Sequence, residues 1–173
     1  MIRRLFLAAA TLLAATAAAA AQTPEEAVAY AFLGLADGAS IERSGTTMSW
    51  VETGSSPAAF DGDAMIGGQK AAIRFIVKAV EECRFEITLE GPSNLVPGGN
   101  RLFGRIDLKN VGDITITDDG FKTSIEGIGF CQTGQRNPTC MTIHDADLFG
   151  SLDAERHSEA VAFLREQGCA AIN

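Results

Sequence analysis

The sequence predicts an α+β fold: an N-terminal helix, an antiparallel β-meander of five to seven strands and a C-terminal helix packed on the sheet. Two stretches with apolar residues at helical spacing frame the chain, one after Thr23 and one after Ser151. Between them, from residue 41 to 143, Gly, Asp and Asn punctuate short runs rich in Ile, Val, Phe and Thr, which is typical of antiparallel strands. Short connections of this kind favour strands that pair with their neighbours in the chain.

Residues 1–21 have the pattern of a secretory signal peptide. Two arginines precede an apolar stretch that ends at Leu13, and alanines lead to a small-x-small cleavage site at Ala21. The apolar stretch is shorter than the roughly 20 residues of a spanning helix, so an uncleaved anchor is the weaker interpretation. We expect a mature bacterial chain that begins at Gln22, is periplasmic or secreted, and has no membrane span. Residues 22–173 would form one globular α+β domain.

Charge limits the classes of partner. The chain has 14 Lys and Arg against 22 Asp and Glu, a net charge of −8, and loss of the two signal-peptide arginines makes it −10. A chain this acidic repels nucleic acid and anionic lipid, so we expect neither as a partner. The remaining candidates are an envelope protein and a small molecule. No sequence motif indicates a cofactor, and we expect none.

All four cysteines follow the predicted signal peptide, and an even number in an exported chain predicts disulfide bonds. Cys131 and Cys140 enclose a polar, turn-rich loop that can bring its ends to bonding distance. This pairing leaves Cys83 with Cys169, which would tie a strand to the last helix. Zinc binding is the alternative, but the chain has no C-x-x-C and its closest cysteines are nine residues apart.

The first helix has a clear start. Thr23 can cap it, Pro24 suits the first helical position and Glu26 completes a capping box. Gly38 marks its end. We expect the helix to pack one apolar face on the sheet, formed by Val28, Ala31, Phe32 and Leu35.

The first clear strand is expected at Thr46–Glu52, and Ser55–Gly68 has the composition of a loop with brief pairing near Phe60. Asp119–Gly120 is a favourable hairpin turn. Glycines 127 and 129 indicate a bulge or a close crossing within a strand. Further strands are expected at Leu102–Leu108, Gly112–Thr117, Phe121–Phe130 and Thr139–Ile143.

Residues 71–90 allow two interpretations. Apolar side chains occupy odd positions in both halves, which predicts two strands joined by a three-residue turn, Val80–Glu82, that aligns Val77 with Phe85. Apolar residues over 69–82 also match the spacing of a helix. The high content of β-branched residues favours the strands.

The closing helix is expected over Ser151–Gln167. Ser151 or Asp153 can cap its start, and Gly168 ends it. Cys169 follows directly, where a disulfide bond would join the helix to the sheet.

Few residues are candidates for a functional site. His144, Asp145 and Asp147 lie close together after a predicted strand, and a histidine with two carboxylates can bind a divalent metal or transfer protons. A solvated turn, in which Asp is common, is the competing interpretation. Trp50, the sole tryptophan, can line a ligand pocket, although such a residue more often belongs to the core.

These observations favour an exported, disulfide-stapled binding or interaction module of unknown ligand. No catalytic, cofactor-binding or metal-binding residue is assigned, and the chain carries no established catalytic motif, so we lean towards a protein that is not an enzyme. One alternative is a small periplasmic hydrolase that uses His144 with Asp145 or Asp147. Another is an inhibitor of a secreted enzyme that presents the Cys131–Cys140 loop.

Overall fold

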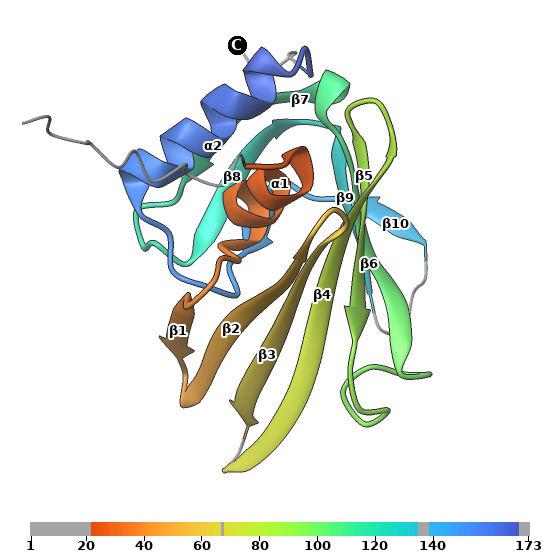
Figure 1. Ribbon diagram of the computed structural model, residues 1–173, viewed down its shortest axis with the longest axis vertical. Helices are drawn as coiled ribbons and strands as arrows, with labels where there is room; N and C mark the ends of the chain where they lie inside the picture. Colours follow the sequence, from red (N-terminus) through yellow and green to blue (C-terminus); the bar gives the residue numbers. More distant parts are fainter. Residues whose placement is uncertain (1–21, 67, 135–138, 170–173) are drawn as a thin grey trace, which may run out of the picture.

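The computed structural model describes residues 22–66, 68–134 and 139–169 and shows an α+β architecture of two α-helices and two antiparallel sheets (Figure 1). The large sheet has the order β1-β2-β3-β4-β5-β6-β9-β10 and the small sheet the order β11-β8-β7. The large sheet comprises β1 (Ser40–Arg43), β2 (Thr46–Ser55), β3 (Ala58–Ile66), β4 (Gln69–Glu81), β5 (Arg84–Glu90), β6 (Asn100–Asp107), β9 (Phe130–Thr133) and β10 (Cys140–Thr142). The small sheet comprises β7 (Val111–Ile116), β8 (Lys122–Gly127) and β11 (Asp145–Asp147), and a short 3₁₀ helix, Leu108–Asn110, precedes β7.

The described part of the chain therefore contains eleven strands in two sheets, where five to seven strands in one sheet were expected. Two of the additional strands, β1 and β11, are only four and three residues long. Strands this short carry too few alternating positions to produce a period-two signal. The predicted signal peptide lies outside the described residues.

Strand β3 corrects the expected loop at Ser55–Gly68. Its nine residues pair with β2 on one side and β4 on the other. Its inward-facing positions include Gly62 and Ala64, because the indole of Trp50 fills the space beside Gly62. Phe60 is therefore the only large side chain among the buried positions 58, 60, 62 and 64, so the alternating apolar signal of the strand is weak.

Residues 69–82 form strand β4, and the helical alternative is wrong. The register differs from the expected one, because Val77 lies opposite Ile87 and Phe85 lies opposite Ala79. The hairpin closes through Cys83, which adopts a positive φ of 63°, and a bulge follows Ala79. The bulge keeps odd-numbered residues of both strands on the inner face, as the apolar pattern requires.

The expected strand Phe121–Phe130 is two strands in different sheets. The chain leaves β8 at Gly127, crosses over at residues 128–129 and enters the large sheet at Phe130. Gly129 permits the close crossing, since a β-carbon there would lie 2.2 Å from the carbonyl oxygen of Asp107. The glycines thus mark a crossing between sheets rather than a bulge within one strand.

Helix α1 (Pro24–Leu33) begins with the expected capping box at Thr23 and Glu26. The large sheet curves around it, so the helix is central rather than packed on the sheet by one face (Figure 1). From Ala27 to Leu33 no residue is more than 3% exposed. This stretch contains a single polar side-chain atom, the hydroxyl of Tyr30, and a helix that is apolar on all sides is stable only when surrounded.

The end of α1 is held by hydrogen bonds from other elements. The carbonyl of Ala31 accepts from the hydroxyl of Thr123 (3.2 Å) and from Nε2 of His157 (3.3 Å). The carbonyl of Leu33 accepts from the backbone N–H of Phe149 (2.8 Å). Terminal carbonyls of a buried helix need such partners, and here the small sheet, helix α2 and a loop supply them.

Helix α2 (Ala154–Glu166) is capped by Asp153. It packs chiefly against α1, whereas direct packing on the sheet was expected. The disulfide bond between Cys83 and Cys169 joins its end to the β4–β5 hairpin. Within the ranges that the structure describes, no helix has both the length and the apolar character to cross a membrane.

Candidate functional site

The three residues of the predicted His–Asp site are all exposed. Asp145 and Asp147 lie on either side of the buried Ala146 in β11, and Asp147 forms an ion pair with Arg43 at 3.1 Å. None of the hollows described below is lined by His144 or by either aspartate. Among the described residues no three His, Cys, Asp or Glu side chains are arranged to hold a metal ion.

Trp50 occupies a core position. Its side chain is 1% exposed, and the indole N–H donates to the carbonyl of Phe149 at 2.6 Å. Its ring lies 5.5 Å from that of Phe75, which also contacts the rings of Phe103 and Phe149. The indole therefore has a packing role and a satisfied donor.

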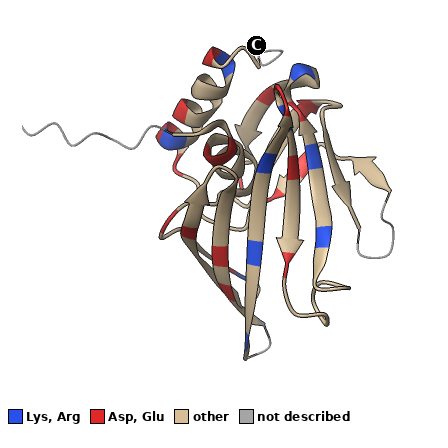
Figure 2. Cartoon of the chain, turned by 45° about the vertical axis from the view of Figure 1, so that its right-hand side comes forward, with Lys and Arg blue, Asp and Glu red and all other residues tan. Residues whose placement is uncertain are grey.

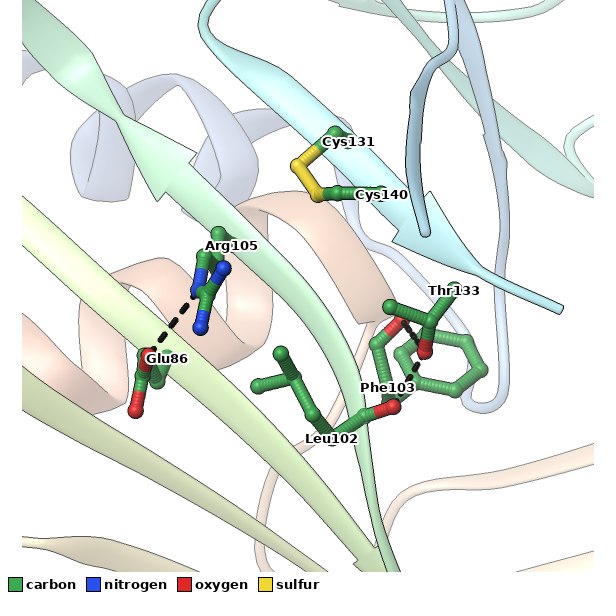
Figure 3. Close-up of a disulfide and its surroundings, with 7 residues drawn as sticks. All are labelled: Glu86, Leu102, Phe103, Arg105, Cys131, Thr133 and Cys140. Carbon is green, nitrogen blue, oxygen red and sulfur yellow. Dashed lines mark hydrogen bonds and ion pairs between the residues drawn. A yellow bond between two sulfur atoms is a disulfide. The ribbon is translucent and has the colours of Figure 1, made fainter. Parts of the chain in front are cut away.

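The two disulfide bonds, Cys83–Cys169 and Cys131–Cys140, have the pairing expected from the sequence. The first encloses a segment of the chain that includes both the β5–β6 region and the small sheet. The second joins the neighbouring strands β9 and β10 (Figure 3). Cys131 is part of the lining of the most apolar surface hollow that we describe, and Cys83 precedes another lining residue, Arg84, in the chain.

This hollow, here called the Ile128 hollow, has a volume of about 390 Å³. It lies on the outer face of the large sheet, between the β4–β5 hairpin, β6 and the crossover into β9. Its lining consists of Val80, Glu81, Arg84, Phe85, Glu86, Arg105, Ile106, Asp107, Ile128, Gly129 and Cys131.

Two aliphatic side chains of the Ile128 hollow are exposed to solvent. Ile128 is 75% exposed and Val80 is 46% exposed, whereas Phe85 and Ile106 are buried beneath them. Ile128 stands at the crossover between the sheets, where the close approach at Gly129 holds the backbone against Asp107. The chain geometry therefore places an apolar side chain in water next to a second one, Val80, and exposed apolar residues that gather in a hollow can mark an interaction site.

Ion pairs surround these aliphatic groups. Arg84 bonds to Asp107 (3.1 Å) and to Glu81 (2.7 Å), and both carboxylates raise the pKa of its guanidinium. Arg105 bonds to Glu86 at 2.9 Å on the adjacent strand (Figure 3). Figure 2 shows the same alternation of basic and acidic positions across β4, β5 and β6. These charges are already paired, so they can form a polar rim but are not arranged as a general acid and base.

The other hollows are less suited to binding an apolar group. One of about 440 Å³ on β2, β3 and β4 contains the exposed Val51 among charged residues. One of about 350 Å³ separates β7 from α2, with His157 in its lining. One of about 360 Å³ has Tyr30 and Arg156 in its lining, and the guanidinium of Arg156 covers the tyrosine ring at 4.4 Å. The Ile128 hollow is distinguished from these three by its two exposed aliphatic side chains.

A group of four carboxyl side chains gathers at the start of α1, here called the carboxyl cluster and formed by Glu25, Glu26, Asp37 and Glu52. Burial, the hydrogen bond to Glu26 and the charge of Glu26 raise the pKa of Glu52 to about 7. Burial opposes ionisation of Glu26 as well, but hydrogen bonds from the Thr23 backbone and from Glu52 outweigh it and lower the pKa of Glu26. Of the two carboxyl groups, Glu52 is therefore the one whose pKa lies higher.

The environment of His157 also shifts the pKa of its side chain. It is 5% exposed, and burial lowers the pKa of its imidazole despite the hydrogen bond to Ala31 and the nearby charge of Asp113. The neutral ring donates from Nε2 to the carbonyl of Ala31. Because the ring satisfies a backbone carbonyl near the end of α1, His157 has a structural role.

Two of these features were missed from the sequence. Ile128 lies between Gly127 and Gly129, and an isoleucine between glycines at a crossing was a signal that could have identified it. Glu52 pairs with a residue 26 positions earlier in the chain, for which the sequence offered no signal. Comparison with protein-family models, with curated proteins and with solved structures found no match to this chain.

Proposed function

We propose that this chain is an exported, disulfide-stapled binding module that recognises a protein partner through the Ile128 hollow. The observation that carries the proposal is the exposure of Ile128, 75% of whose surface is in water although the backbone around it is tightly packed. Protein interfaces commonly place apolar anchors in a centre surrounded by polar groups. Ile128 and Val80 match the centre, and the ion-paired residues match the rim.

The location of α1 supports a surface site. Because the helix occupies the concave side of the large sheet, that side is filled by the chain's own residues. The excess of acidic residues disfavours nucleic acid and anionic membranes, which leaves a protein as the macromolecular partner. The partner would insert an apolar side chain beside Ile128 and place polar groups against Arg84 and Arg105.

Export is part of the proposal. It rests on the pattern of residues 1–21 and is supported by the two disulfide bonds, which persist in oxidising compartments. The bonds also stiffen the site: Cys83 lies in the hairpin that borders the hollow, and Cys131 is part of its lining. Preformed geometry reduces the entropy lost on binding.

Affinity capture from envelope extract tests the site. The wild-type protein, an Ile128→Ser variant and a Met141→Ser variant are compared, because Met141 is also exposed, at 53%, but lies on β10 outside the hollow. We expect a protein that the wild type and Met141→Ser retain equally and that Ile128→Ser retains at least about tenfold less, the loss of about 1.4 kcal/mol of binding energy. Equal retention by all three variants would contradict the proposed site.

The hydrolase alternative is tested in parallel with His144→Ala. His144 is exposed, so we expect the variant to stay folded, with a change of no more than about 0.5 kcal/mol in the free energy of unfolding. We also expect it to retain the captured partner and the wild-type phenotype. A folded His144→Ala protein that reproduced the deletion phenotype would place a functional site at this histidine and contradict the non-enzymatic proposal.

A further inference from the structure

The small sheet ends in a strand whose outer edge is unpaired. In the order β11-β8-β7, strand β7 has a neighbour on one side only among the described strands. It is also the longest of the four edge strands, with six residues against four in β1 and three each in β10 and β11. An exposed edge presents backbone N–H and C=O groups that another strand can pair with, and proteins usually keep such edges short or charged. The free edge of β7 is therefore a candidate pairing site.

The register identifies the residues of β7 that face this edge. The N–H of Thr117 donates to the carbonyl of Lys122, on the side of β8. Residues of an antiparallel pair alternate between those that are bonded to the neighbouring strand and those that are not. Ile114 and Ile116 are an odd number of positions from Thr117, so their backbone groups face away from β8. The carboxylate of Asp113 accepts the N–H of Ile114 at 3.0 Å, which leaves the carbonyl of Ile114 and both backbone groups of Ile116 for a further strand.

Helix α2 forms the far wall of a groove along this edge. The groove has a volume of about 350 Å³, and one wall is formed by four consecutive residues of β7, 113–116. The other wall is one face of α2, formed by Ala154, His157, Ser158, Val161, Ala162 and Arg165. An extended chain advances about 3.3 Å per residue, so the β7 wall is on the order of 10 Å long, enough for a short added strand.

The lining of the groove favours an uncharged segment that carries a hydrogen-bond donor. Its two charged residues, Asp113 and Arg165, pair with each other at 3.5 Å. His157 is 5% exposed, and its ring donates from Nε2 to the carbonyl of Ala31. Among the described residues none is recorded as a donor to its other ring nitrogen, Nδ1. Because buried polar atoms are normally hydrogen-bonded, an acceptor of this kind in the lining indicates a ligand that brings an N–H or O–H group.

We propose that the groove between β7 and α2 binds an extended, uncharged segment of a partner polypeptide, which adds to the small sheet as a fourth strand beside β7. The backbone of the segment pairs with Ile114 and Ile116, and one of its N–H or hydroxyl groups donates to Nδ1 of His157. Strand addition of this kind takes its affinity from main-chain hydrogen bonds and its specificity from the side chains along the groove. The groove shares no lining residue with the Ile128 hollow, so the inference does not rest on the proposed function.

A phage-displayed library of random heptapeptides, selected on the purified protein, provides the probe. The selected peptides are tested against Ser158→Phe and Glu159→Phe, which both add phenylalanine to an exposed position of α2, but only Ser158 lines the groove. We expect a class of peptides that Ser158→Phe binds at least about tenfold more weakly than the wild type, whereas Glu159→Phe and Ile128→Ser bind them equally well. Recovery of no peptide with this dependence would overturn the inference. Peptides that are lost only in Ile128→Ser would support the proposed function alone.

N-methylation of a selected peptide tests strand addition itself. Each amide of a peptide that depends on Ser158 is methylated in turn, which removes one N–H donor at a time. Because only every second residue of an added strand is bonded to the edge, we expect affinity to fall at least about tenfold at alternate positions and to change much less at the positions between them. A loss that does not alternate would overturn the inference. The protein is unchanged in this experiment, so the folding of a variant does not affect the result.

Discussion

The indole ring of Trp50 lies over Gly62 on the neighbouring strand, and a β-carbon at position 62 would lie 2.3 Å from Cζ3 of the ring. Trp50 cannot easily retreat, because its N–H is bonded to Phe149 and its far side contacts the ring of Phe75. The indole of Trp50 therefore fills the space that Gly62, which has no side chain, leaves open. A single methyl group at position 62 therefore has no room.

Gly62→Ala should destabilise the fold. Displacement of the indole, or of β3, would cost about 1–3 kcal/mol of unfolding free energy, the usual range for overpacking a core. Urea denaturation measures the loss, with Ser49→Ala on the outer face of β2 as the control. Equal stability of Gly62→Ala and Ser49→Ala would show that the indole has space to move.

The two disulfide bonds should differ in their contributions. Cys83–Cys169 spans 86 positions and Cys131–Cys140 spans 9, so loss of the first removes a larger restriction on the unfolded chain. In the chain-entropy model the losses are about 4–5 and about 2–3 kcal/mol, respectively. Paired Cys→Ala variants compared by denaturant unfolding measure the order. If the short loop proved the more stabilising, native-state contacts rather than loop length would control the difference.

His157 should make the fold sensitive to acid. Burial lowers the pKa of its imidazole in the folded state, so its contribution is present above the unfolded value near 6.5 and is lost as the pH falls through the lowered folded value. We expect His157→Gln, which keeps an N–H donor for Ala31, to gain stability relative to wild type between pH 7.5 and pH 5. His144→Gln is the control, because His144 is exposed. Denaturant unfolding across this range would refute the prediction if both variants followed the wild-type profile.

The contributions of His157 and Glu52 have opposite signs between pH 5 and pH 7, because the raised pKa of Glu52 makes its contribution complete below about 4.5 and lost as the pH rises through about 7. The wild-type profile alone can therefore be nearly flat while both groups titrate. Each contribution has to be obtained from the difference between a variant and the wild type at the same pH. A double variant should show additive effects, since the two side chains share no recorded partner.

Local signals in the sequence were sufficient for the starts of both helices and for the disulfide pairing, but the expected end of the first helix at Gly38 is wrong, because Gly34 already ends α1 in a left-handed conformation. The capping box at Thr23 depends on residues three positions apart, and the Cys131–Cys140 loop on residues nine apart. Most of strand β3 escaped prediction because its buried positions other than Phe60 are Ala and Gly, and Trp50 from another strand fills the space beside Gly62. The register of β4 on β5 was shifted because the positive φ at Cys83 made the turn tighter than the apolar pattern indicated.

The candidate site was harder to predict than the fold, because it is formed by residues that are far apart in the chain. Ile128 belongs to a hollow only because the β4–β5 hairpin brings Val80 beside it, across almost 50 residues of sequence. Burial and then Glu26, on a different element, raise the pKa of Glu52. Proximity of residues that are distant in the chain is a property of the completed topology, and a single sequence carries no direct record of it.

The central position of α1 also determines the order in which the molecule can be assembled. Among the described elements the helix is the first to be synthesised, yet its main packing partner, α2, is the last, and only β3 and β4 among its other partners are complete in the first half of the chain. Until α2 is available, the face of this apolar helix that α2 covers is exposed to water, and contacts of such wide sequence separation form slowly. Folding intermediates of this protein should therefore be prone to aggregation, and the newly made chain should depend on a chaperone that shields residues 24–36 until its last helix is available.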